Sequence, residues 1–196
     1  MTSPGSSTIT VGTANIKLEG ITAKGYGTFT QKEYGDFEES LGLRRGLSMS
    51  LMQEDDWSFV IKLHALLEAA LAEALMQHTS ADLAASEKIW KRRTGGADDK
   101  LAAAKAAGLI DGPMEVFLNW LTRLRNLMVH RVENIYFNLE SYVQSLDQGQ
   151  RQDVVDALVV AGDDAARAKL LTDSPKTALL WSATAVLEKL VGPKKP

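Results

Sequence analysis

The chain contains no cysteine, and this absence excludes several classes of site. Without a thiol there is no disulfide framework, no thiolate nucleophile and no thiolate metal site. Only three histidines are present, His64, His78 and His130, and none belongs to a His-Glu-x-x-His arrangement. A dedicated zinc site is therefore not expected, and we expect the protein to work without a metal or another cofactor.

Long apolar runs and nucleotide-binding fingerprints are also missing. No apolar stretch reaches membrane-spanning length without charges, and the N-terminus is rich in Ser, Thr and Gly instead of resembling a signal peptide. We therefore expect a cytoplasmic protein with no membrane partner. The sequence has no Gly-rich phosphate loop, no Rossmann fingerprint and no internal repeat.

Positively and negatively charged residues are nearly balanced in number. The chain has 22 Lys and Arg against 25 Asp and Glu, for a formal net charge of -3. This excludes a globally basic nucleic-acid coat, although a local basic site stays compatible with it. At 196 residues the chain is long enough for one domain with extensions and a core of its own.

Helical periodicity predicts an all-α bundle. Apolar residues recur at helical spacing in the segments 54–77, 100–108, 114–130, 135–146, 150–160 and 175–190. The first of these segments is apolar over so much of its circumference that it is either central to the bundle or covered by another subunit. We divide the chain into an N-terminal extension (1–50), a helical domain (51–192) and a basic tail (193–196).

The N-terminal extension differs in composition from the rest of the chain. Apolar and polar residues alternate weakly in the segments 8–11, 16–19 and 26–30, which are separated by Gly-containing turns. Two interpretations stay open, namely short strands in a hairpin or small meander, and a flexible arm. A two-stranded unit is marginal by itself, so strands would have to pack on the helical body or on a partner.

The chain is organised around the segment 114–132. One side of this predicted helix is an apolar stripe formed by Phe117, Leu121, Leu124 and Met128. The other side is polar and carries Asn119, Arg123, Asn126 and His130. Arg125 falls on the border between them. An Arg, an Asn and a His are thus presented together near the C-terminal end of an otherwise apolar helix.

From the residues alone, two interpretations of this group are open. In the first, Asn126 and His130 are ordinary polar-face residues and Arg125 extends to water. In the second, the group handles phosphate. Arg125 then supplies a charged fork for phosphate oxygens, His130 exchanges a proton near neutral pH, and Asn126 orients either partner.

A cationic segment precedes this helix. It carries four cations around one aromatic ring and ends at two glycines; these residues are Lys88, Trp90, Lys91, Arg92 and Arg93, followed by Gly95 and Gly96. Such a run is either a solvated surface or a basic loop that grips a phosphate backbone and stacks a base. In the second interpretation, Lys100 and Arg123 extend the same RNA-binding surface.

His64 and Glu68 lie one turn apart on the first long helix. They are either a local hydrogen-bonded pair, or Glu68 faces the 114–132 helix and positions Arg125 or His130.

The string Arg125-Asn126-x-x-x-His130 resembles the Arg-x4-6-His motif, with a polar residue after the Arg, of the HEPN superfamily (higher eukaryotes and prokaryotes nucleotide-binding). The resemblance extends to the segment 59–75, which is similar to the long first helix of bacterial HEPN proteins. It also includes the segment 99–110, which is similar to their Lys-Leu…Gly-Leu-Ile element. The similarity covers roughly residues 55 to 146 and implies a HEPN-like helical bundle.

The resemblance implies a metal-independent endoribonuclease. In that family branch the motif helices of two chains form a composite site, where a ribose 2′-hydroxyl attacks the adjacent phosphate of single-stranded RNA. His130 would transfer the proton, Arg125 would stabilise the phosphoryl oxygens, and Asn126 would orient His130 or the phosphate. The expected setting is a toxin or phage-defence system with RNA, a second copy of the chain, and an antitoxin or other protein as partners.

Two other functions stay open. Many HEPN domains are non-catalytic modules that bind nucleotide, RNA or a protein, and a helical accessory protein docking through residues 1–50 is a further alternative. Some HEPN toxins carry a modified Tyr two residues after the His. Val132 stands there in this chain, so that form of regulation is not expected.

Overall fold

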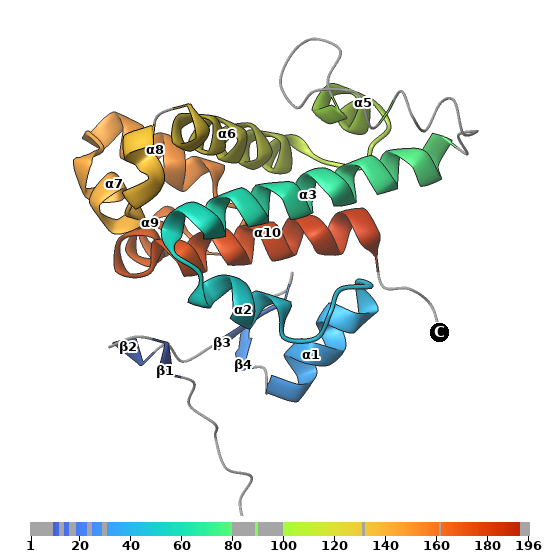
Figure 1. The fold of residues 1–196 in the computed structure, drawn as a ribbon. Coiled ribbons are helices and arrows are strands. Elements are labelled where there is room, and N and C mark those ends of the chain that lie inside the picture. The colour runs from blue at the N-terminus through green and yellow to red at the C-terminus, as the bar shows by residue number, and fades with distance from the viewer. Residues whose placement is uncertain are drawn as a thin grey trace, which may run out of the picture.

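The computed structural model shows an all-α bundle, as predicted (Figure 1). It describes residues 10–11, 14–15, 19–22, 25–28, 31–79, 89, 100–130, 132–160 and 162–192. The helices of the described part are α1 (Gln31–Ser40), α2 (Leu47–Gln53), α3 (Asp56–Thr79), α5 (Lys100–Ala106), α6 (Gly112–Val129), the 3-10 helix η1 (Val132–Tyr136), α7 (Leu139–Ser145), α8 (Gln148–Ala157), α9 (Asp164–Asp173) and α10 (Pro175–Val191).

Helix α3 is the centre of the bundle. It lies between α10 and α6, and α2, α5 and η1 also pack against it (Figure 1). Its buried side chains, among them Phe59, Leu63 and Leu71, point to more than one of these neighbours because the helix is apolar over most of its circumference. Of the two explanations for this wide apolar face, the central position is therefore the correct one. Neighbours from the same chain cover it, and it gives no argument for a second subunit.

Helix α10 is the other deeply buried helix. It begins with Pro175, whose fixed φ suits a first turn, and most of its side chains down to Leu190 are buried. Its main partners are α3 and α9. The core is thus built from two long helices that are far apart in the sequence.

A polar staple joins the beginnings of α3, α7 and α10. One carboxylate oxygen of Asp56 accepts a hydrogen bond from the Leu139 backbone N–H (2.7 Å), and the other lies 2.9 Å from Lys176 Nζ. The same ammonium group lies 5.6 Å from the centre of the Phe59 ring and donates to the Glu54 carbonyl. The three helix ends are therefore held together by one largely enclosed ion pair.

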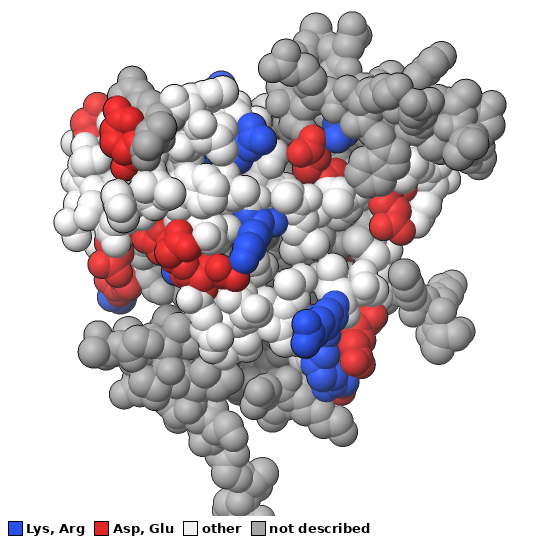
Figure 2. All heavy atoms as spheres, viewed as in Figure 1, with Lys and Arg blue, Asp and Glu red and all other residues white. Residues whose placement is uncertain are grey.

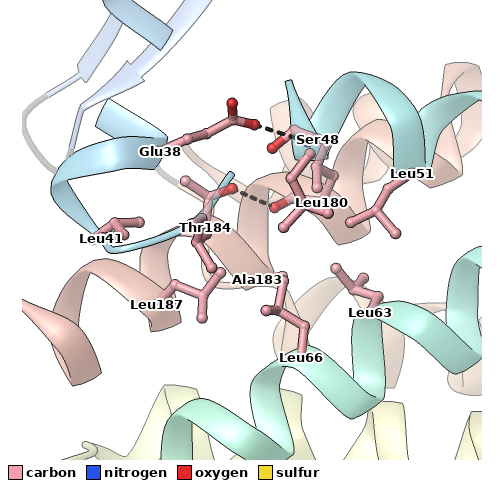
Figure 3. Close-up of a pocket in the computed structure, with 12 residues that line it drawn as sticks. Glu38, Leu41, Ser48, Leu51, Leu63, Leu66, Leu180, Ala183, Thr184 and Leu187 are labelled. Carbon is pink, nitrogen blue, oxygen red and sulfur yellow. Dashed lines mark hydrogen bonds between the residues drawn. The ribbon is translucent and has the colours of Figure 1, made fainter. Parts of the chain in front are cut away.

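Helices α1 and α2 attach to the outer side of the α3–α10 pair. The buried Glu38 carboxylate accepts hydrogen bonds from the backbone N–H groups of Ser48 (Figure 3) and Gly46. It thereby satisfies donors at the start of α2 that have no partner within the helix. Leu41 and Leu51 belong to the core. A small apolar hollow lies at this junction. It is lined by Glu38, Leu41, Leu43, Leu47, Ser48, Leu51, Leu63, Leu66, Leu180, Ala183, Thr184 and Leu187. Helix α2 spans residue 50, where we had placed the start of the helical domain.

Before α1 the chain forms two antiparallel strand pairs. Strand β1 (Thr10–Val11) pairs with β2 (Ala14–Asn15), and β3 (Glu19–Thr22) pairs with β4 (Gly25–Thr28). In the second pair, Glu19 is opposite Thr28 and Thr22 is opposite Gly25. Each alternating segment that we singled out overlaps a strand, at residues 10–11, 19 and 26–28, and the rest of these segments lies outside the described residues. The tail 193–196 lies outside the described residues.

Within the described residues, no helix combines the length and the apolar character that crossing a membrane requires.

Candidate functional site

Helix α6 presents the Arg-Asn…His group. It begins at Asp111, whose side chain accepts the Met114 backbone N–H (3.0 Å), and Pro113 lies in its first turn. The predicted stripe of Phe117, Leu121, Leu124 and Met128 is buried. That burial fixes the rotation of the helix, so that Arg125 and Asn126 are half-buried at its edge and His130 is exposed.

The turn before α6 places α5 next to it. Helix α5 ends in a Schellman arrangement, in which Gly108 N–H bonds to Lys105 O (3.0 Å) and Leu109 N–H bonds to Ala104 O (2.9 Å). Gly108 has φ 70°, a value that glycine adopts without strain. The end of this helix at Gly108 was predicted, and it is confirmed.

Arg125 has no charged partner among the residues that the structure describes. Its Nη1 donates to the neutral Oδ1 of Asn126 (2.9 Å), and in the described part of the chain no carboxylate lies within ion-pair distance of its guanidinium. By contrast, Arg45 and Arg167 have carboxylate partners. The guanidinium of Arg125 thus keeps charge and donors available for an anion.

His130 lies apart from Arg125 in a single chain. It is the C-cap residue of α6 (φ -94°, ψ -1°) and is exposed. Five residues along a helix correspond to a rotation of about 140° and a rise of about 7.5 Å. No hydrogen bond joins His130 to Arg125 or Asn126 within the described residues. The two groups of one chain therefore point in different directions from the end of α6, and no hydrogen bond between them is present.

Beneath α6, a buried histidine connects it to α3. His64 Nε2 lies 3.2 Å from the Thr122 hydroxyl, and this hydroxyl donates its proton to the Leu118 carbonyl (2.8 Å). Because the hydroxyl proton is already used, Nε2 must carry the hydrogen and donate it to Thr122. Thr122 lies one turn before Arg125 on the same helix, so His64 fixes α6 close to the motif.

Glu68 turns from this contact toward α5. Its Oε1 accepts from Lys100 Nζ (2.8 Å), while its Oε2 is 3.9 Å from His64 Nδ1, which is too long for a hydrogen bond. The expected hydrogen-bonded pair of His64 and Glu68 is thus an electrostatic contact only. The alternative, in which Glu68 positions Arg125 or His130, finds no hydrogen bond between these side chains in the described part of the chain.

The surroundings hold His64 in its neutral form. Burial lowers the pKa of His64 below its ordinary 6.5; the Glu68 carboxylate raises it, and the charges of Arg125 and Lys100 lower it further. His64, Glu68 and Thr122 line a small hollow with Leu67, Leu71, Leu101, Leu118 and Leu121.

No family model, curated protein or solved structure matches this chain significantly. The assignment of function therefore depends on the site. In the described residues, no three His, Asp or Glu side chains converge as the ligands of a metal ion would.

The expected RNA-binding residues fall into three groups. Lys88, Trp90, Lys91, Arg92 and Arg93 lie outside the described residues. Arg123 is exposed, as an RNA contact must be. Lys100 is different, because it is only 3% exposed and bonds to Glu68, so its ammonium group does not face solvent. On the face in Figure 2, Lys and Arg of the described part are scattered, and acidic side chains gather at the end formed by α7 and α8.

Several large apolar side chains of α6 and η1 are exposed. The large apolar residues that are exposed, among those described, all belong to α6 or η1; they are Val116, Leu127, Val129, Ile135 and Tyr136. Asn134 Nδ2 donates to the Leu127 carbonyl (2.6 Å) and fixes η1 against the end of α6. We had not predicted this surface, although the sequence Ile135-Tyr136 directly after the motif is its visible signal.

Proposed function

We propose that this protein is a metal-independent endoribonuclease of the HEPN type that cleaves single-stranded RNA. The observation that carries the proposal is the half-buried guanidinium of Arg125. It is held by a neutral amide and has no carboxylate partner in the described part of the chain. A cation that is kept in place but not neutralised is suited to a phosphate, whose oxygens match its planar fork.

In the proposed reaction, the ribose 2′-oxygen attacks the adjacent phosphorus and the bond to the 5′-oxygen breaks. The products are a 2′,3′-cyclic phosphate and a 5′-hydroxyl. His130 transfers the proton and Arg125 stabilises the charge on the phosphoryl oxygens. Asn126 holds the guanidinium through its Oδ1. Unpaired RNA is favoured because its 2′-hydroxyl can rotate into line with the leaving oxygen.

The proposed active form is a homodimer. Its support is the exposure of Leu127 and His130, which lie one turn apart on the same side of α6. Pairing of two α6 helices through this side would bury Leu127. It would also bring His130 of one chain toward Arg125 of the other. The expected cytoplasmic setting, as a toxin or defence enzyme controlled by an antitoxin or other protein, belongs to the same proposal.

One observation favours a second candidate, a module that binds RNA or a nucleotide without cleaving it. Arg125 and His130 make no contact within one chain, so the single chain offers an anion-binding group without a proton-transfer group next to it.

The deciding experiment is RNA cleavage in the presence of a chelator. Purified wild type is incubated with single-stranded and hairpin RNAs, and the products are analysed for cyclic-phosphate ends. His130→Ala and Arg125→Ala should each reduce cleavage by about 10²-fold or more, as expected for a proton-transfer group and an oxyanion-stabilising group. His78→Ala and Arg44→Ala are matched controls, because both residues are exposed and lie outside the site.

Binding separates the two candidates. If wild type binds RNA but does not cleave it, and only Arg125→Ala weakens binding, the binding module is correct. If both substitutions leave cleavage intact, the site assignment is wrong.

A further inference from the structure

Helix α6 carries a second arginine, Arg123, on its outer side. Arg123 and His130 are seven residues apart, so their side chains point in nearly the same direction from the helix. Both are exposed, and Leu127, which lies about one turn from each of them, is 42% exposed. The outer side of α6 thus presents an apolar side chain between an arginine and a histidine.

No acidic side chain of α6 accompanies Arg123 on this side. The one acidic residue of this helix is Glu115, and its carboxylate lies 2.6 Å from Lys105 Nζ on α5. Among the described residues, the side chain of Arg123 takes part in no ion pair. The charge on the outer side of α6 is therefore suited to contact with an anion.

Antiparallel pairing of two α6 helices about Leu127 brings these groups together across the interface. Along the helix axis, His130 lies about 4.5 Å beyond Leu127, and Arg123 lies about 6 Å before it. In an antiparallel pair, His130 of one chain and Arg123 of the other are therefore at nearly the same height, about 1.5 Å apart along the axis. Two-fold symmetry repeats this pair on the other side of Leu127.

The charges favour this arrangement over a parallel pair. Parallel helices would place the two Arg123 side chains next to each other, and like charges in contact repel. In the antiparallel pair the two Arg123 residues are about 12 Å apart along the axis. The antiparallel arrangement thus separates the guanidinium groups and sets each of them beside a histidine.

We propose that Arg123 of one chain and His130 of the other bind the same RNA phosphate across the dimer interface. This inference rests on the proposed function and adds a residue to its site. Arg125 points to a different side of α6 from Leu127, so Arg123 is the cation that the paired faces themselves supply. Its planar guanidinium matches two phosphate oxygens, next to the group that transfers the proton.

Cross-linking tests the arrangement without RNA, and the chain has no cysteine of its own to interfere. Arg123→Cys, Leu127→Cys and His130→Cys are made as single variants. A mixture of Arg123→Cys and His130→Cys should form a mixed disulfide on mild oxidation, because a disulfide needs Cα atoms within about 7 Å and only residues at the same height approach so closely. Leu127→Cys should cross-link with itself.

The single variants supply the controls. Arg123→Cys alone and His130→Cys alone should form no more disulfide than Arg44→Cys, which is exposed and lies outside the site. Disulfides in either of the first two would indicate a parallel pair and overturn the proposal. A Leu127→Cys chain that does not cross-link would also overturn it, because the helices would not pair through this side.

A mixing experiment tests the shared site by cleavage. Arg123→Gln and His130→Ala should each lose about 10²-fold in rate. An equimolar mixture of the two should recover about one quarter of the wild-type rate, because half of the dimers are mixed and each mixed dimer keeps one of its two sites intact. If both residues acted within one chain, every site of the mixture would lack one of them and no rate would be recovered.

The inference and the proposed function fail in different ways. If wild type cleaves RNA but the mixture recovers no rate and forms no mixed disulfide, the nuclease stands and Arg123 has no part in its site. If wild type does not cleave, binding of a single-stranded oligodeoxynucleotide still tests the inference, because this probe has the phosphates without the 2′-hydroxyl. Arg123→Gln should weaken that binding about tenfold, and Arg123→Lys should stay within about threefold of wild type. Unchanged affinity in Arg123→Gln would overturn the proposal.

Discussion

The hydrogen bond between His64 and Thr122 is the contact that ties α3 to α6 closest to the motif, and its removal gives a clear test. Thr122→Val replaces the hydroxyl by a methyl group of nearly the same size. The Nε2–H of His64 then loses its acceptor, which lies 3.2 Å away. The ring is 7% exposed and the threonine 8%, so water has little access to take its place.

The expected cost follows from this burial. An unsatisfied buried donor costs about 1–3 kcal/mol, and we take about 2 kcal/mol for this site. For a chain of this length, that corresponds to a fall in Tm of roughly 4–8 °C. The double variant His64→Leu/Thr122→Val replaces both partners by apolar groups. It should lie within about 1 kcal/mol of wild type, because no buried donor is left without a partner.

The assay is urea denaturation followed by circular dichroism, at a pH well above 6.5, where His64 is neutral. Thr172→Val is the control. Its hydroxyl bonds to the carbonyl four residues earlier in the same way (2.9 Å) but is exposed, so the free energy of unfolding should change by less than about 0.5 kcal/mol. The reasoning is refuted if Thr122→Val is as mild as this control, or if the double variant is as unstable as the two single variants added together.

Three further predictions concern other features. The pKa of His64 in the folded protein lies below 6.5, so the unfolded chain binds more protons than the folded one as the pH falls from 6.5 toward the folded pKa. The free energy of unfolding should therefore decrease over this pH range. Urea titrations at several pH values should show a smaller decrease for His64→Leu. Asp56→Ala should cost about 2–4 kcal/mol, because it leaves the Leu139 N–H and the mostly enclosed Lys176 without their partner; an unchanged urea midpoint would contradict this. Leu127→Glu should convert the proposed dimer to a monomer in light scattering, with a stability change within about 0.5 kcal/mol because the side chain is 42% exposed; a persistent dimer would place the interface elsewhere.

Most of the helices could be predicted because their signals are local. Helix α9 was not predicted, and the segment 135–146, expected as one helix, divides into η1 and α7. The buried stripe from Phe117 to Met128 repeats every three or four residues, and the end at Gly108 depends on one residue that adopts a positive φ. The wide apolar face of α3 was also visible in the sequence. The sequence did not show whether another helix or another subunit covers this face. The spacing of apolar residues indicates which residues are buried, but not which element buries them.

The buried polar network could not be predicted for a related reason. Thr122 and His64 are 58 positions apart, and nothing in either local sequence indicates the other. Lys100 was expected on the surface because lysine is rarely buried, whereas it is enclosed here and bonds to Glu68 on a neighbouring helix. Contacts between elements, which decide the roles of charged residues, depend on the packing of the whole bundle.

The distance in sequence between α3 and α10 also has a consequence for the synthesis of the protein. Helix α3 ends at Thr79, whereas its main partner runs from Pro175 to Val191. At the usual rate of translation, on the order of ten seconds passes between the appearance of these two helices. During that interval the ribosome-bound chain exposes the leucine-rich face of α3. The part of α3 that α10 covers in the folded protein therefore has no partner from its own chain until the C-terminal segment has been synthesised.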